Sequence, residues 1–145
     1  MQKITPFLWF DGKLEEAVKF YTTVFRNARV ESLSPMIATF VIEGQEFMAL
    51  NGGPQFKFNE AVSFFIRCET QDEVDYFWQR LTNDGGVESR CGWLKDKFGL
   101  SWQVIPKALG RCLSDPDRKK AGRAQEAMMK MQKIIIADLE KAFAG

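Results

Sequence analysis

The spacing of apolar residues predicts a clear succession of elements at the start of the chain. Residues 4–10 form an almost uninterrupted apolar run, which is typical of a buried strand. Apolar residues then recur at helical spacing from Leu14 to Phe25, and Asp11 is placed to cap that helix. Three strand-like stretches follow, and Glu43-Gly44-Gln45 suits a tight hairpin between the last two. We therefore predict a β-α-β-β-β order, with the later strands at residues 29–33, 37–42 and 46–50.

The same succession is predicted a second time after a break at Asn51-Gly52-Gly53-Pro54. Thr70 and Glu73 have the spacing of a capping box at the start of a second helix. Residues 16–21 of the first helix align with residues 73–78 of the second, each at the same distance behind an apolar strand. Such a repeat indicates two copies of one unit, neither able to bury its sheet face alone. The strands of the second copy are expected at residues 61–68, 87–93 and 100–105.

The chain changes character after Pro106. A turn or cap is expected at residues 114–117, then a helix over residues 121–131, and a last helical turn or two over residues 137–143. The β-branched run Ile134-Ile135-Ile136 is expected to break or bend the helix between them. Two placements of this tail stay open: it covers its own sheet, or it packs on a second subunit.

The predicted fold is α+β, with two βαβββ modules forming curved mixed sheets and a C-terminal helical tail. We expect a single domain over residues 1–145, with module one at 1–53, module two at 58–106 and the tail at 107–145.

Charge and composition exclude several classes of partner. The net charge is +1 with both signs mixed along 145 residues, so nothing favours nucleic acid. No apolar segment approaches the ~20 residues of a membrane span, and Asp11 and Glu15 interrupt any signal-peptide pattern. The three cysteines, Cys68, Cys91 and Cys112, form no CxxC pair and are expected to be reduced thiols. We therefore expect a cytoplasmic protein with no membrane partner.

The chain contains no histidine, which restricts its chemistry. A Ser-His-Asp or Cys-His arrangement is impossible, and a base at neutral pH would have to be a perturbed carboxylate, lysine or thiol. The candidates near the expected cavity are Asp96, Lys95, Cys91, Cys68 and Glu60, each of which also has a plain structural explanation. No catalytic residue is assigned.

Several motifs together resemble one family. They are residues 4–12, Asn51-Gly52-Gly53-Pro54, residues 56–60, Gly92-Trp93-Leu94-Lys95-Asp96 and Gly99-Leu100-Ser101-Trp102-Gln103. The chain resembles the PhnB-like branch of the vicinal oxygen chelate superfamily, the glyoxalase and bleomycin-resistance group. Some members of the branch carry the name 3-demethylubiquinone-9 3-methyltransferase. The resemblance implies a glyoxalase-like fold, a cavity formed by curved sheets and a homodimer.

The resemblance also implies where a metal would bind, since enzymes of the superfamily hold a divalent ion with four residues from the two modules. Those positions correspond here to Pro6, Ser63, Gln103 and the stretch from Met48 to Leu50. Proline has no donor side chain, serine is a poor ligand and glutamine is neutral, whereas such ions favour imidazole and carboxylate. We therefore predict no bound metal and no cofactor.

Aromatic and neutral polar residues in these motifs favour binding of a small molecule. The alternative is an enzyme of the same superfamily, either a metal-dependent lyase, isomerase or dioxygenase, or the methyltransferase of the family label. No glycine pair joins a strand to a helix as a nucleotide-binding turn would, so only the label supports a methyltransferase. It stays open whether Trp93 and Trp102 line the pocket or fill the sheet. The pocket candidates are Trp9, Phe56, Phe58, Asn59, Ser63, Trp93, Ser101, Trp102 and Gln103.

Overall fold

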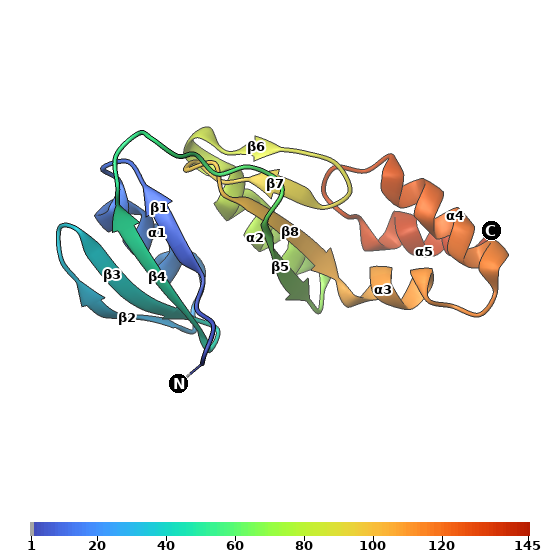
Figure 1. The fold of residues 1–145 in the computed structure, drawn as a ribbon. Coiled ribbons are helices and arrows are strands. Elements are labelled where there is room, and N and C mark those ends of the chain that lie inside the picture. The colour runs from blue at the N-terminus through green and yellow to red at the C-terminus, as the bar shows by residue number, and fades with distance from the viewer. Residues whose placement is uncertain (1) are drawn as a thin grey trace. The chain divides into compact units, whose positions relative to one another are not determined.

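Two compact units make up the computed structural model, which describes residues 2–145. One unit extends to Phe58 and the other runs from Asn59 to Gly145. Each unit holds a four-stranded mixed sheet, in the order β1-β4-β3-β2 in the first and β5-β8-β7-β6 in the second (Figure 1). The second order repeats the first strand for strand, which confirms the predicted α+β fold of two βαβββ modules with a helical tail. No helix within residues 2–145 is long and apolar enough to cross a membrane.

The first unit follows the predicted order closely. Its β3–β4 hairpin turns at Glu43 and Gly44, whose φ angles of 50° and 79° match the two left-handed positions of a type I′ turn. The predicted cap at Asp11 is wrong, because the Asn51 side chain at the end of β4 accepts the Leu14 N–H at 3.0 Å instead. The elements are β1 (Phe7–Phe10), α1 (Leu14–Val24), β2 (Ala28–Leu33), β3 (Ile37–Ile42) and β4 (Gln45–Asn51).

The second unit corrects one predicted strand. Residues 87–93 do not form a single strand, because Cys91 and Gly92 adopt φ angles of 59° and 84° that turn the chain before Trp93. The predicted cap of the helix is confirmed in part: Thr70 accepts the Glu73 N–H, while the Glu73 carboxylate accepts from Glu69. The elements are β5 (Ser63–Cys68), α2 (Gln71–Thr82), η1 (Asn83–Gly85), β6 (Val87–Glu88), β7 (Trp93–Lys95) and β8 (Ser101–Pro106).

Each sheet packs one face against a helix, and the strand pleat decides which residues lie there. In the first unit α1 packs on β2, β3 and β4, and the residues on the covered face are buried: Leu8, Phe10, Ala38, Phe40, Phe47 and Ala49. In the second unit α2 packs on β5, β7 and β8. The face of each sheet that is turned away from its helix is called the open face below.

The C-terminal tail packs on its own unit, which is one of the two placements left open above. It contains a helix that the sequence did not predict, α3 (Lys107–Leu113), followed by α4 (Arg118–Met129) and α5 (Ile136–Ala144). These helices lie beyond the end of β8 in Figure 1. Asp117 caps α4 by accepting the Lys119 and Lys120 N–H groups, as the predicted turn there implied. The cluster that joins tail and sheet consists of Ile105, Leu109, Cys112, Ala124, Ile134 and Leu139.

The segment between α4 and α5 is fixed by polar contacts on both sides. The Gln71 side chain at the start of α2 donates to the Ile134 carbonyl at 3.0 Å and accepts the Ile136 N–H at 2.7 Å. The Gly92 N–H donates to the Gln132 carbonyl at 2.8 Å, and Lys133 pairs with Asp75 at 2.9 Å. The side chain of Ile134 is consequently fully buried.

We predict that Ile134→Ala lowers the free energy of unfolding by about 2–5 kcal/mol, because it leaves a cavity between the tail and the sheet. Ile4→Ala is the matched control, since Ile4 is 83% exposed, and its effect should stay within about 0.5 kcal/mol. Urea denaturation followed by circular dichroism measures both. Equal effects of the two substitutions would show that the tail is not part of the cooperative unit.

Candidate functional site

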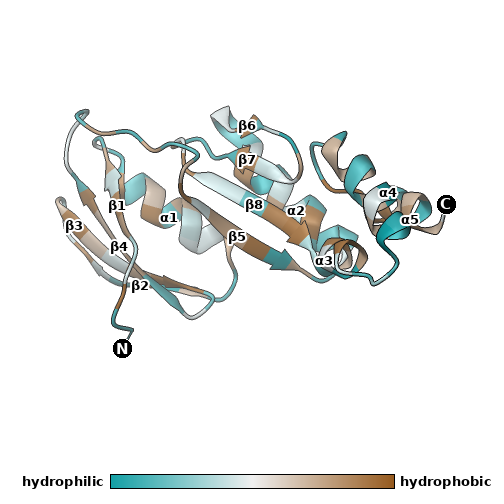
Figure 2. Cartoon of the chain, turned by 45° about the vertical axis from the view of Figure 1, so that its right-hand side comes forward, coloured by the Kyte–Doolittle hydropathy of each residue, from teal (hydrophilic) through white to brown (hydrophobic). Residues whose placement is uncertain are grey.

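Polar residues interrupt the apolar surface on the open face of the second sheet. Gln103 of β8 lies between Trp93 of β7 and Phe65 of β5 at the same register. Two residues before Gln103 in β8, Ser101 lies between Lys95 of β7 and Ser63 of β5. Figure 2 shows the corresponding change along β8, from polar at its start to hydrophobic at its end. The predicted candidates Ser63, Trp93, Ser101 and Gln103 therefore share one face, and we call this group with Phe65 the Gln103 face.

A hydrogen bond joins two strands of this face. The Gln103 side-chain nitrogen Nε2 donates to the Ser63 Oγ at 3.0 Å. Both side chains are half-buried, so the bond is formed in partial contact with solvent. It leaves the Gln103 Oε1, one Nε2 hydrogen and the Ser63 hydroxyl hydrogen without a partner among residues 2–145.

Two further polar groups of the Gln103 face also lack partners within residues 2–145. The Ser101 hydroxyl is buried, with 1% of the residue exposed, and no hydrogen bond reaches its oxygen. The Trp93 indole N–H likewise makes no hydrogen bond. Buried polar groups are normally satisfied, so the Ser101 hydroxyl marks a place where water or a ligand completes the structure, and the N–H of the half-buried Trp93 is available beside it.

Lys95 and Glu60 form an ion pair at the Ser101 end of the face, with the Lys95 Nζ 2.7 Å from a Glu60 oxygen. The hydrogen bond from Lys95, reinforced by its charge, lowers the pKa of Glu60. A carboxylate shifted in this direction is a weaker base than an ordinary one, so Glu60 does not fit the role of general base.

Trp102 lies on the opposite face of the sheet from Gln103. Its indole Nε1–H donates to the Asp96 Oδ2 at 2.9 Å, and the Asp96 Oδ1 accepts the N–H groups of Phe98 and Leu100 at 2.9 and 3.1 Å. Asp96 and Trp102 are both buried, at 2% and 4% exposed. The role of this aspartate is to accept hydrogen bonds that close the loop between β7 and β8, and Trp102 packs in the core.

Four further candidates, one in β1 and three between β4 and β5, serve packing and turns. The Trp9 indole N–H donates to the Gly53 carbonyl at 2.9 Å, and its ring meets Phe56 edge to face at 5.0 Å. Phe58 packs against Phe10 at 5.4 Å. The Asn59 side chain accepts the Ala61 N–H at 2.9 Å, which forms a local turn.

Of the three free cysteines, two are buried. Burial, with a smaller contribution from the charge of Glu73, raises the pKa of Cys68 to about 12. Burial also raises the pKa of Cys112. Neither thiol forms a thiolate at neutral pH, so neither fits the role of nucleophile or base. Cys91 is half-exposed in the turn before β7.

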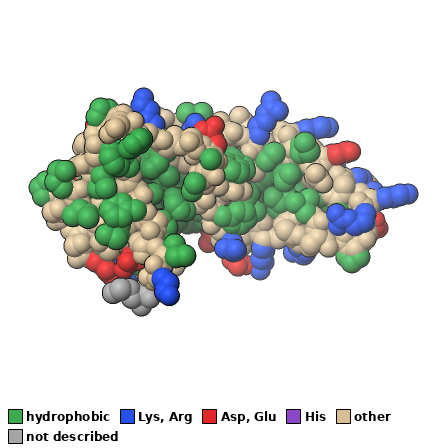
Figure 3. Space-filling model, in the orientation of Figure 1, with side chains coloured by type: hydrophobic (Ala, Val, Ile, Leu, Met, Phe, Trp, Pro, Cys, Tyr) green, Lys and Arg blue, Asp and Glu red, His purple; other side chains and the backbone are tan. Residues whose placement is uncertain are grey.

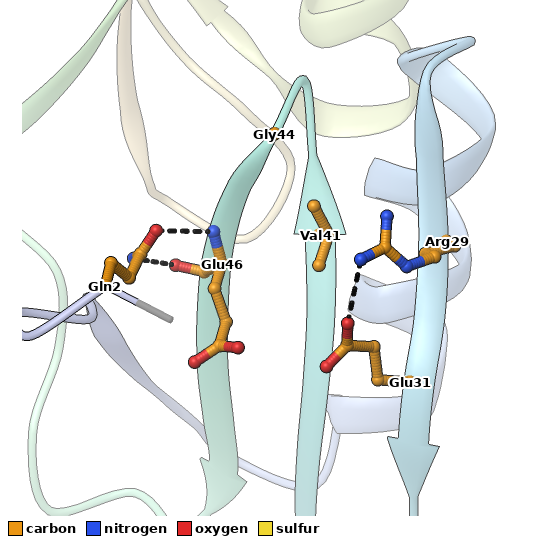
Figure 4. Close-up of a pocket in the computed structure, with 6 residues that line it drawn as sticks. All are labelled: Gln2, Arg29, Glu31, Val41, Gly44 and Glu46. Carbon is orange, nitrogen blue, oxygen red and sulfur yellow. Dashed lines mark hydrogen bonds and ion pairs between the residues drawn. The ribbon is translucent and has the colours of Figure 1, made fainter.

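The first unit has a shallow pocket of its own, with a volume of about 420 Å³ (Figure 4). Its polar groups already satisfy one another. Gln2 donates to the Glu46 carbonyl and accepts the Glu46 N–H, and Arg29 pairs with Glu31 at 3.0 Å. We therefore favour the Gln103 face, where polar groups remain available.

The sequence interpretation missed Phe65. The signal was present, because Ser63 and Phe65 lie two residues apart in one predicted strand and so point to the same face. Phe65 is 48% exposed, which is unusual for a phenylalanine in a strand interior.

Comparison with known proteins gives the family. The model of the 3-demethylubiquinone-9 3-methyltransferase family matches residues 2–105. A PhnB protein from Bacillus cereus is 36% identical, with a TM-score of 0.67 over 72% of this chain and 99% of that one. This chain belongs to the 3-demethylubiquinone-9 3-methyltransferase (PhnB-like) family. The predicted resemblance is thereby confirmed, and the tail lies outside the matched residues. No curated protein gives a significant match.

More distant structures share the fold alone. A glyoxalase-related enzyme from Fulvimarina pelagi is 17% identical, with a TM-score of 0.55 over 73% of this chain and 88% of that one. The fosfomycin resistance protein FosX from Listeria monocytogenes, complexed with Mn(II) and sulfate, is 14% identical, with a TM-score of 0.53 over 70% of this chain and 87% of that one.

The residues at the metal positions that the resemblance implies do not fit a divalent ion. In the second module they are Ser63 and Gln103, two neutral groups hydrogen-bonded to each other. In the first module Pro6 offers no side-chain donor, and Met48 to Leu50 offer no oxygen or nitrogen side-chain ligand. Within residues 2–145 no cluster of three or more His, Cys, Asp and Glu side chains is placed to hold a metal. This donor set lacks the charge that such ions favour.

We predict that Asp96→Asn lowers the free energy of unfolding by about 1–3 kcal/mol, because the new amide N–H₂ faces donors in place of an acceptor. Trp102→Phe should also destabilise the protein. The double variant should lose less stability than the sum of the two single losses, and the difference, the coupling free energy, should be about 0.5–3 kcal/mol. Urea denaturation of the four proteins measures this cycle, and strict additivity would contradict the assigned contact.

Proposed function

We propose that this protein binds a small organic molecule on the Gln103 face without a metal ion. The observation that carries the proposal is the set of partnerless polar groups on Gln103, Ser63, Ser101 and Trp93, beside the exposed ring of Phe65. Apolar walls with a few convergent polar groups are the usual composition of a small-molecule site.

Binding is favoured over catalysis because the carboxylate and thiol candidates named here offer no suitable acid or base. Glu60 is held ionised by Lys95, Cys68 is held protonated, and Asp96 is engaged in the core. The family name includes a methyltransferase, and that reading is the alternative function. S-adenosylmethionine therefore belongs in any panel of test compounds.

We infer that the protein is a homodimer. The open face of the first sheet and its rim expose apolar side chains, including Phe7, Met36 and Ile37 at 49%, 62% and 45%. Figure 3 shows hydrophobic side chains at the surface of this unit. Exposed apolar patches of this kind mark interaction surfaces. We also infer a cytoplasmic location from the three unpaired thiols, which cell fractionation tests.

A ligand screen by thermal shift tests the binding proposal. At least one metabolite should raise the melting temperature in the presence of EDTA, since a ligand at 100 times its Kd adds about 2.7 kcal/mol. Gln103→Ala should lower the affinity for that compound at least about tenfold. Glu31→Gln, in the separate pocket of the first unit, is the control and should leave affinity unchanged. Loss of binding on adding EDTA, or equal affinity of Gln103→Ala and the parent, would refute the proposal.

Light scattering tests the dimer. The parent should have twice the mass of one chain, and Phe7→Glu with Ile37→Glu should reduce it to that of one chain, because buried charges oppose association. Met129→Glu is the control on the tail, where Met129 is also exposed. A parent protein that is monomeric at tens of micromolar would contradict the inference.

A further inference from the structure

We propose that the Gln103 face recognises a neutral planar ring through an edge that carries adjacent hydrogen-bond donor and acceptor groups, as a lactam does. This inference rests on the proposed function and specifies the chemical class of its ligand. It follows from three features of the face: the spacing of its aromatic side chains, the remaining hydrogen-bonding capacity of Gln103, and the neutralised charges around it.

The spacing of Trp93 and Phe65 suits a flat ligand. They lie on the strands to either side of β8, and both are register partners of Gln103. Neighbouring strands are about 4.8 Å apart, so these side chains start about 10 Å from each other. A ring packed between two faces needs about 3.5 Å on each side, or about 7 Å in total. A planar molecule standing edge-on to the sheet therefore fits between them.

The amide of Gln103 supplies a donor and an acceptor at the floor of this space. Its Oε1 and one Nε2 hydrogen remain available, and the bond to Ser63 restricts rotation of the amide. A side-chain amide presents these two groups side by side, which is how glutamine pairs with the donor–acceptor edge of a nucleobase. A lactam N–H and C=O are the complementary pair. The Ser63 and Ser101 hydroxyls can complete further bonds.

The charges around the face favour a neutral ligand. Lys95 is already paired with Glu60 at 2.7 Å, and the Arg67 guanidinium lies over the Phe65 ring at 5.4 Å. At Gln103 an anionic ligand would find Lys95 already paired, and Arg67, which has no carboxylate partner among the described residues, lies further along the face beside Ile105. A cationic one would have to compete with Lys95 for Glu60. A neutral amide edge has neither cost.

The test uses three probes of nearly the same shape on the full-length protein: 2-quinolinone, 1-methyl-2-quinolinone and quinoline. Protein-observed ¹H–¹⁵N spectra report the side-chain amide of Gln103 and the indole N–H of Trp93. We expect 2-quinolinone to shift both signals and to bind about tenfold more tightly than the other two probes, because 1-methyl-2-quinolinone lacks the N–H and quinoline lacks both the N–H and the C=O. Trp93→Ala should lower the affinity for all three probes by the same factor, whereas Gln103→Leu should remove only the preference for 2-quinolinone.

The outcomes separate this inference from the function on which it rests. If the three probes bind alike, or if none binds while another compound shifts the same signals, the lactam class is wrong and small-molecule binding stands. If no compound in a metabolite panel shifts the Gln103 or Trp93 signals, the proposed function fails and the inference fails with it. The comparison of probes on the parent protein stays decisive even if Gln103→Leu does not fold.

Discussion

One helix for each four-stranded sheet is the constraint on which the rest of this structure depends. The pleat sends alternate residues of every strand to opposite faces, so a single helix can bury only half of them. α1 and α2 fill that half with the cores of their units, including Phe40 and Val104, both fully buried. The other half must meet solvent, a ligand or another protein surface. Both proposals made above, for binding and for dimerisation, concern these uncovered halves.

The two open faces differ in chemistry, and the difference follows from a few side chains. The first is apolar at one end, where Phe7 and Ile37 are partly exposed as a protein–protein contact requires, and charged at the other, where Arg29 and Glu46 flank Val41. The second carries the hydrogen-bonded pair of Gln103 and Ser63 in its middle. At one end the tail packs on Ile105, and at the other the ion pair of Lys95 with Glu60 lies beside Ser101. Its polar middle is therefore bounded on both sides.

The repeat, the sheet class and most strands were predictable because strand and helix periods are local properties of the sequence. The break at Cys91 and Gly92 was not, because positive φ at a non-glycine residue is imposed by contacts with residues 131–132, far along the chain. The cap from Asn51 to Leu14 is a tertiary contact for the same reason. Ser63 and Gln103 were found from a family resemblance, whereas the separation of Trp102 from Gln103 follows from the period of two within one predicted strand and was missed.

A crystal structure of the full chain with the compound that binds most tightly in a metabolite screen tests the account most directly. We predict electron density for an organic molecule between Trp93 and Phe65, hydrogen-bonded to the Gln103 amide. Contradiction would come from a cation bonded to the oxygens of Ser63 and Gln103, or from protein side chains filling that space.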